Sequence, residues 1–274
     1  MTTFSLQLRK LCPNEENQVP GAKGRKLVHM TTKSLTLVAT LIVAICISSA
    51  GGPAASANKA TATLRGTVKL EGRTPRATPI NMAADPNCAK QHPTPVMCQE
   101  VVTDANGGLQ NVIVFVADGL TEQTFEPPNH PVVLDQKGCM YQPHMLAMQA
   151  NQPMEVVNDD PTSHNIHPVP ANNREWNKSE PPGTRAEETF PREEIAIPVK
   201  CNIHPWMHGY VAVFKHPYFA VTGKDGSFDL GNLPPGTYTI KAWHEKLGTS
   251  TQKITVGANE TKAIDFVLKS PAGT

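Results

Sequence analysis

The sequence predicts an all-β protein, on the evidence of two kinds of strand pattern and of the residues between them. In residues 63–70, apolar or small side chains alternate with polar ones, which is the period of a half-buried strand. Residues 112–116 form a short, continuous apolar run, which is typical of a strand buried inside a sandwich. The stretch 71–100 is rich in proline and polar residues, so we expect a long excursion there. After residue 57, no segment shows the periodicity of a helix longer than a few turns.

The middle of the chain predicts a second series of strands. Its apolar segments are separated by turns such as Asn151-Gln152-Pro153 and by a stretch rich in Pro, Asn and Glu at 168–194, which we expect to be a surface loop. The predicted strands are 132–134, 141–148, 154–158, 195–200 and 210–214.

The tail has a different signature. Lys224-Asp225-Gly226 predicts a turn, and the segments 228–230, 237–240 and 264–268 alternate as strands do.

A metal-binding loop is the most specific feature of the sequence. Cys201, His204 and Met207 place a thiol, an imidazole and a thioether within seven residues, and His164 lies upstream. Two His and one Cys, with a weak and distant Met, are the ligand set of a blue-copper electron-transfer centre. Sulfur ligands favour Cu(I), and imidazole suits both oxidation states. A loop that supplies most of the ligands can hold one geometry that both states accept, so little has to move when an electron arrives. Zinc is the main competitor, although a thioether is a poor ligand for it.

The loop resembles that of the amicyanin-like branch of the cupredoxins, in which Cys-x-x-His-x-x-Met carries a Pro directly after the His. The segments 164–167 (His-Asn-Ile-His) and 209–214 also resemble that branch, whereas Ser163 stands where many relatives have Pro. The resemblance implies a Greek-key sandwich over residues 131–217. It also implies one mononuclear type 1 copper site, whose ligands are His164, Cys201, His204 and Met207.

The same resemblance assigns roles to neighbouring residues. Asn165 is expected to tie the upstream loop to the backbone near Cys201, although a plain turn Asn remains an alternative. His204, Pro205 and Trp206 are expected to form an exposed apolar rim through which electrons pass, unless Trp206 is a core aromatic. Two further histidines could replace a ligand but are interpreted as non-ligands at the edge of the site: His167 and His208.

The tail resembles the carboxypeptidase-regulatory, transthyretin-like sandwich, through Gly226-x-Phe228 and the run 233–239 (Leu-Pro-Pro-Gly-Thr-Tyr-Thr). Such domains open with strands like those at 65–68 and 111–116, which precede the copper segment. We therefore expect a discontinuous transthyretin-like domain, residues 61–130 and 218–270, with the cupredoxin inserted. The alternative is two independent domains preceded by an unrelated segment.

Residues 1–57 predict a leader with a signal peptide. The apolar run at 35–47 is too short for a membrane span of roughly 20 residues, and Ala55-Ser56-Ala57 is typical of a cleavage site. Met30 would also open a signal of ordinary length. We expect a periplasmic or extracellular protein with no membrane span after cleavage.

The charge balance limits the class of partner. Of 25 basic and 24 acidic residues, six and two lie in the leader, so the remainder carries 19 and 22 and a net charge of about −3. A mildly acidic chain argues against nucleic acid. It suits transient encounters with a redox donor and a redox acceptor.

Besides Cys201, three cysteines follow the leader: Cys88, Cys98 and Cys139. In an oxidising compartment a disulfide is expected, either Cys88–Cys139 or Cys88–Cys98. The open alternative is a second metal site, because each of two cysteines has a histidine four or five residues on, at His92 and His144.

The favoured function is single-electron carriage by an exported blue-copper protein. Copper storage or delivery, and a structural β-sandwich interaction module, remain alternatives. Nothing indicates an enzyme, since His244-Glu245 has no nucleophile or second carboxylate beside it.

Overall fold

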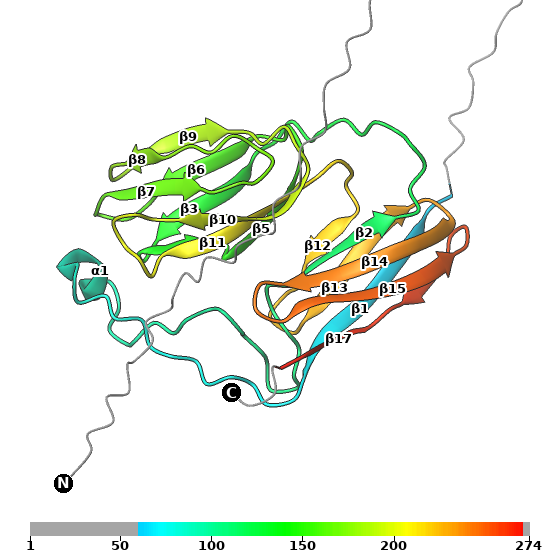
Figure 1. Cartoon of the computed structure of the whole chain (residues 1–274), viewed down its shortest axis with the longest axis horizontal. Helices are drawn as coiled ribbons and strands as arrows, with labels where there is room; N and C mark the ends of the chain where they lie inside the picture. Colours follow the sequence, from blue (N-terminus) through cyan, green and yellow to red (C-terminus); the bar gives the residue numbers. More distant parts are fainter. Residues whose placement is uncertain (1–59, 271–274) are drawn as a thin grey trace, which may run out of the picture. The chain divides into compact units, whose positions relative to one another are not determined.

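The computed structural model describes residues 60–270, which hold 17 β-strands and one five-residue helix. The strands form four sheets (Figure 1), so the prediction of an all-β protein is confirmed. The predicted leader, residues 1–57, lies outside the described residues. Within the described part, α1 (Pro86–Lys90) is the only helix and is far too short to cross a membrane.

Strands β3 to β11 form what we call the central sandwich. Its first sheet runs β5-β11-β10-β7-β8, with β5 and β11 parallel. The strands of this sheet are β5 (Met145–Gln149), β7 (His164–Pro168), β8 (Lys178–Glu180), β10 (Glu194–Lys200) and β11 (His208–Phe214). The second sheet has the order β4-β3-β6-β9 and consists of β3 (Val132–Lys137), β4 (Met140–Gln142), β6 (Met154–Asn158) and β9 (Arg185–Glu188).

The remaining strands, from both ends of the described chain, form the split sandwich. One sheet contains β1 (Ala62–Glu71), β13 (Ser227–Leu233), β16 (Thr261–Ala263) and β17 (Phe266–Lys269). The other has the order β12-β2-β14-β15 and consists of β2 (Ile113–Asp118), β12 (Phe219–Val221), β14 (Gly236–His244) and β15 (Gly248–Val256). The segment between β2 and β12 holds the whole of the central sandwich.

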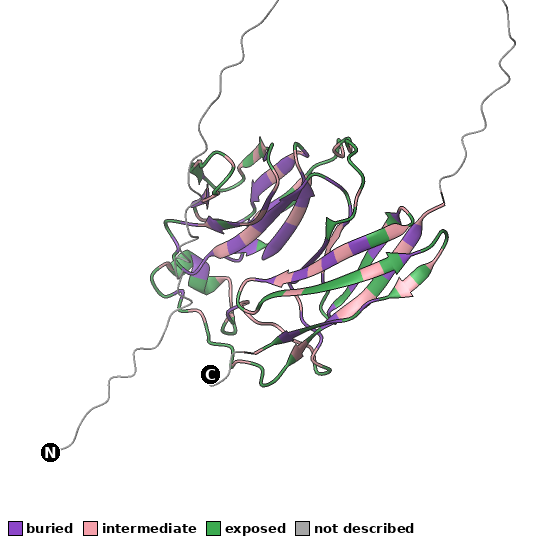
Figure 2. Ribbon diagram, turned by 45° about the vertical axis from the view of Figure 1, so that its right-hand side comes forward, coloured by how far each residue is buried: buried purple, intermediate pink, exposed green. Residues whose placement is uncertain are grey.

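Each sandwich has its own core, because alternate side chains of each strand point inward. The alternation is regular along β14, where buried residues recur at every second position, and appears as colour bands along the strands in Figure 2. Leu134, Val156 and Val211 belong to the central core, and Leu64 and Ile240 to the split core.

The two sandwiches also share a third apolar cluster, which explains the continuous apolar run at 112–116. Val114 and Val116 belong to the split core, whereas the side chains of Ile113 and Phe115 lie on the opposite face of the same sheet. There they join Phe214 and other residues of the central sandwich. Strand β2 is therefore buried on both faces, which removes the need for polar residues at alternate positions.

Three details differ from the predicted strands. The predicted strand 141–148 is two strands in different sheets, since Pro143 lacks the N–H that a continuous ladder requires. The predicted loop 168–194 contains β8 and β9, and β15 was not predicted at all. All three strands lie at sheet edges and expose most of their side chains, so their sequences lack an apolar alternation.

The predicted excursion between β1 and β2 reaches the central sandwich. Asp85 caps α1 by accepting a hydrogen bond from Asn87 N, and Pro86 occupies the first turn, where its missing N–H costs nothing. Met82 and Cys88 are buried in the central core. A segment that precedes the central sandwich in sequence thus forms part of its wall.

Candidate metal centre

The two predicted ligand segments meet because β7 and β10 are neighbouring antiparallel strands. His164 opens β7, and Cys201 directly follows β10. The loop from 201 to 207 then returns to β11, closed by hydrogen bonds from Cys201 N to Met207 O (3.0 Å) and from Met207 N to His204 O (2.9 Å). Sheet pairing therefore brings together residues that are about 40 positions apart in sequence.

His164, Cys201 and His204 converge on one point. Nδ1 of His164 lies 2.9 Å from Nδ1 of His204, and Sγ of Cys201 lies 3.8 Å from the latter atom. One ligand atom from each of the three residues lies within 4.8 Å of the other two. Their exposed fractions are 0%, 3% and 2%, so the set is closed to bulk water.

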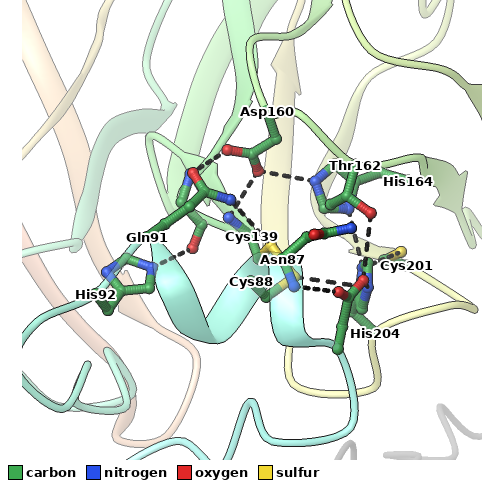
Figure 3. The surroundings of a disulfide bond; sticks show 12 residues. Asn87, Cys88, Gln91, His92, Cys139, Asp160, Thr162, His164, Cys201 and His204 are labelled. Carbon is green, nitrogen blue, oxygen red and sulfur yellow. Dashed lines mark hydrogen bonds and ion pairs between the residues drawn. A yellow bond between two sulfur atoms is a disulfide. The ribbon is translucent and has the colours of Figure 1, made fainter.

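Two carboxylates hold the outer edges of the imidazole rings. Asp160 Oδ2 lies 2.8 Å from Nε2 of His164 (Figure 3). Asp85 Oδ2 lies 3.0 Å from Nε2 of His204. A carboxylate on Nε2 of each ring turns the two Nδ1 atoms toward each other, and metal-bound histidines commonly have a carboxylate on their other nitrogen. Asp160 is itself fixed by Gly138 N and Cys139 N, each at 2.7 Å.

The electrostatics of the set favour a thiolate beside positively charged imidazole rings. Burial raises the pKa of Cys201, but hydrogen bonds to His164 and His204 outweigh it and lower that pKa to about 6. Burial lowers the pKa of His164, but the Asp160 and Cys201 partners raise it to about 9. The hydrogen bond to His204 holds the pKa of Asp85 below its ordinary value. A thiolate is the form of Cys that binds metals.

Asn165 and Tyr141 tie the two ligand segments to each other. Oδ1 of Asn165 accepts hydrogen bonds from Asn202 N (2.6 Å) and Ile203 N (3.3 Å), as expected for a residue that links the upstream segment to the Cys201 loop. The same oxygen lies 3.4 Å from Cys201 Sγ. Tyr141 donates its hydroxyl to Asn165 O (2.8 Å) and to Lys200 O (3.2 Å). These bonds fix the spacing between the ligand loops.

The prediction of an exposed rim at 204–206 was wrong for two of its three residues. Pro205 is exposed, but His204 is 2% and Trp206 8% exposed. Trp206 donates Nε1–H to Cys139 O (3.2 Å), and its ring lies 5.0 Å from that of His204. The excursion that carries Asp85 contributes to this burial, since Asp85 contacts His204 directly. Met207 is fully buried in the central core.

Cys88 and Cys139 form a disulfide, one of the two pairings that the sequence left open. The two cysteines are therefore not available as thiolate ligands, and the hypothesis of a second site based on them is wrong. Nε2 of His92 instead lies 2.8 Å from Gly138 O. Cys201 remains a free thiol. The disulfide anchors α1 beside His204, whose Nε2 lies 3.7 Å from Cys88 Sγ.

His167 and His208, interpreted as non-ligands, lie outside the convergent set. His167 pairs with Glu175 (2.7 Å) and contacts Asn202 Oδ1 (3.2 Å). Nδ1 of His208 lies 3.1 Å from Trp206 O.

Sequence reasoning missed Asp85 and Asp160. The position of Asp160 four residues before His164 could have indicated that the two side chains pair. Asp85 is 119 residues from His204, so nothing in the sequence indicated that contact.

The residues present fit a copper ion. Two ring nitrogens and one thiol sulfur point at a common position, and the opposite nitrogen of each ring already has a partner. The set combines imidazole and thiolate donors, and within it there is no carboxylate of the kind that a hard cation prefers.

Comparisons with known proteins give two similarities. Residues 210–269 match the family model of the carboxypeptidase regulatory-like domain. Among solved structures, the chain is similar to a purple cupredoxin from Nitrosopumilus maritimus, with 28% identity, 28% of this chain and 84% of that one covered, and a TM-score of 0.25. It is also similar to a reduced amicyanin variant, with 21% identity, 36% and 97% coverage, and a TM-score of 0.28.

A third solved structure is a copper-containing nitrite reductase from Thermus scotoductus SA-01, at 20% identity and a TM-score of 0.30. The match covers 36% of this chain and about a quarter of the reductase, 26%. None of the curated proteins compared with the chain is significantly similar to it. The chain is thus similar to cupredoxins and, in its tail, to a carboxypeptidase regulatory-like domain, as the two sequence resemblances predicted.

Proposed function

We propose that this protein is an exported blue-copper carrier of single electrons. His164, Cys201 and His204 would hold one copper ion, with Met207 as a weaker fourth ligand, and the metal would supply the Cu(II)/Cu(I) couple. The observation that carries the proposal is the convergence of two Nδ1 atoms, 2.9 Å apart, beside a free, buried thiol. No substrate bond is made or broken in this function.

The surroundings of the set suit a site that changes little between oxidation states. Asp85, Asp160 and Asn165 each fix a ligand or its loop through hydrogen bonds of 2.6 to 3.0 Å. Ligands held in this way stay in place when the charge of the site changes, and a small rearrangement makes electron transfer fast.

The loop between the proposed ligands exposes Asn202, Ile203 and Pro205, and the two apolar residues among them flank the buried His204. Ile203 is 52% exposed, an unusual value for a large apolar side chain. A small apolar patch of this kind suits short-lived redox encounters, which bury little area. We infer that donor and acceptor proteins dock at this loop tip.

Export agrees with the chemistry of the other cysteines. A Cys88–Cys139 disulfide persists in oxidising compartments and is rare in the cytosol of mesophiles. We therefore propose a periplasmic or extracellular location, in line with the predicted leader.

Storage or delivery of copper is the weaker alternative. A protein that hands over its metal needs ligands that a partner or chelator can reach, whereas His164, Cys201 and His204 are all at most 3% exposed.

The test is to add Cu(II) to the metal-free protein and record visible and electron paramagnetic resonance spectra. An intense blue absorption band with narrow copper hyperfine splitting is expected, and both should disappear in Cys201→Ser. A colourless complex, or a blue Cys201→Ser variant, would overturn the ligand set. Slow release of copper to an external chelator, together with fast electron self-exchange between Cu(I) and Cu(II) protein, would separate carriage from storage.

A further inference from the structure

A second cluster of metal-ligating side chains lies where the two sandwiches meet. It consists of His144 and His208 from the central sandwich and Glu245 from the split sandwich. One ligand atom from each of the three lies within 4.8 Å of the other two. The predicted function uses none of them: His208 was interpreted as a non-ligand, and Glu245 as part of a polar strand end.

Strand pairing explains why these residues meet. β5 and β11 are parallel, and Tyr210 N donates to His144 O (2.9 Å), so His144 and His208 sit at the same end of the two strands. Their rings are 5.4 Å apart. Glu245 directly follows β14, whose Trp243 ring packs 5.9 Å from Tyr210. The apolar cluster shared by the two sandwiches thus brings the carboxylate to the two imidazoles.

Some buried nitrogen and oxygen atoms of the cluster have no hydrogen-bond partner. Nε2 of His144 pairs with Oε1 of Glu245 at 2.5 Å, and these two side chains are 3% and 2% exposed. Nδ1 of His144 and Oε2 of Glu245 are also buried, and neither has a hydrogen-bond partner in the described part of the chain. A buried nitrogen or oxygen left unpaired costs free energy, so an isolated ion pair does not account for this arrangement.

The third residue is oriented for a metal. Nδ1 of His208 lies 3.1 Å from Trp206 O, and a carbonyl oxygen can only accept, so this nitrogen carries the proton. Nε2 of His208 then keeps its lone pair. A histidine whose other nitrogen donates to a backbone carbonyl is the usual form of a metal-bound imidazole.

We propose that His144, His208 and Glu245 bind one divalent transition-metal ion of the Zn²⁺ class, which links the two sandwiches. Two imidazoles and one carboxylate are a known zinc ligand set with a fourth position for water. Ligand atoms around a tetrahedral Zn²⁺ lie about 3.3 Å apart. The paired atoms of His144 and Glu245 would therefore move apart from 2.5 Å, and the His208 atom lies within 4.8 Å of both. The site is separate from the proposed copper site, but His208 directly follows Met207, so both sites use the same chain segment.

The first experiment is a metal count. Metal-free protein is incubated with Zn²⁺, freed of loosely bound metal by gel filtration, and analysed by mass spectrometry of the metal. The wild type is expected to retain one more zinc ion per chain than Glu245→Gln or His144→Gln. This difference holds whatever the Cys201 site takes up, so failure of the copper proposal would not affect it.

Matched variants test for nonspecific loss. His130→Gln and Glu175→Gln change an exposed histidine and an exposed glutamate elsewhere on the central sandwich, and both should retain zinc as the wild type does. Zn²⁺ should also raise the thermal midpoint of the wild type by more than that of folded Glu245→Gln. Equal zinc content in wild type and folded Glu245→Gln would overturn the proposal and leave a buried ion pair only.

A measurement on the wild type covers the case in which both variants fail to fold. With Cu(II) already bound to the protein, Co²⁺ should add one equivalent and give weak visible bands without a sulfur-to-cobalt charge-transfer band. Failure to bind any cobalt other than through sulfur would overturn the proposal.

Discussion

Asp85 accepts a hydrogen bond of 3.0 Å from Nε2 of His204, although the two residues are 119 positions apart in sequence. The carboxylate belongs to the excursion between β1 and β2, and its other oxygen caps α1 through Asn87 N at 2.8 Å. The split sandwich thus contributes, through this loop, a negative charge to a proposed copper ligand of the central sandwich. The copper chemistry of the protein should depend on this loop.

The first prediction is that Asp85→Asn raises the reduction potential of the copper site. A carboxylate behind His204 stabilises Cu(II) more than Cu(I), and asparagine removes the charge while remaining a good N-cap for α1. The expected rise is on the order of 50 mV, close to the 59 mV of a tenfold change for a one-electron couple. Cyclic voltammetry gives the value. Asp229→Asn, at an exposed carboxylate paired with Arg65, should leave the potential unchanged, and an unchanged potential in Asp85→Asn would contradict the prediction.

The second prediction concerns the disulfide that anchors α1. Cys88 and Cys139 are 51 residues apart, and in the chain-entropy model a loop of this length stabilises a protein by about 4 kcal/mol. The double variant Cys88→Ser/Cys139→Ser should lose most of this free energy of unfolding, as measured by guanidinium denaturation. It should also release copper to a chelator faster, because the disulfide no longer holds α1 against His204. Equal stability of the variant and the oxidised wild type would refute the anchoring role.

Local patterns were sufficient for those parts of the fold whose side chains alternate or lie in one loop. Strand β6 begins and ends where the sequence predicts, because Met154 and Val156 face the core between clear turns. The proposed ligand loop could also be predicted from the local sequence, since Cys201, His204 and Met207 share one backbone turn. Interactions between near neighbours in sequence leave a signal in the sequence.

Contacts between distant segments left no such signal. The burial of His204 and Trp206 depends on Asp85 and on the carbonyl of Cys139, which come from other parts of the chain. Glu245 looked like an ordinary strand end, and only the packing of β14 against β11 brings it to His144. The edge strand β15 was missed for a related reason: its side chains are largely exposed, so it pairs through backbone bonds that any sequence can form.

The third prediction is that Asn165→Leu weakens both the fold and the copper site. Leucine cannot accept the hydrogen bonds from Asn202 N and Ile203 N, so two backbone donors of the ligand loop lose their partner. Leaving partly buried donors unpaired should lower the free energy of unfolding by about 1–3 kcal/mol. Copper affinity should fall by about 10- to 100-fold, as when other groups that hydrogen-bond to metal-binding segments are removed.

Asn165→Asp is the matched control, since it keeps an acceptor oxygen at the same position and should retain most of the affinity. A competitive chelator titration measures both variants. If leucine and aspartate lower the affinity equally, the acceptor oxygen is not what positions the loop.

The last prediction is that Asp135→Asn stabilises the protein at neutral pH. Oδ1 of Asp135 is buried and has no hydrogen-bond partner within residues 60–270. Burial raises the pKa of this carboxyl, and the charge of Asp159 raises it further. A raised pKa in the folded state means that stability is complete below the ordinary value of 3.8 and is lost as the pH rises through the folded pKa. The wild type therefore carries a penalty at pH 7 that asparagine removes.

The thermal midpoints of the two proteins test this directly between pH 8 and pH 4. The variant should melt at a higher temperature at pH 7, and the difference should shrink steadily as the pH falls toward 4, because the wild-type carboxyl becomes protonated. Asp229→Asn, at an exposed position, should show no comparable gain. A difference that does not depend on pH would point to packing or hydrogen bonding of the amide, and the electrostatic cause would be wrong.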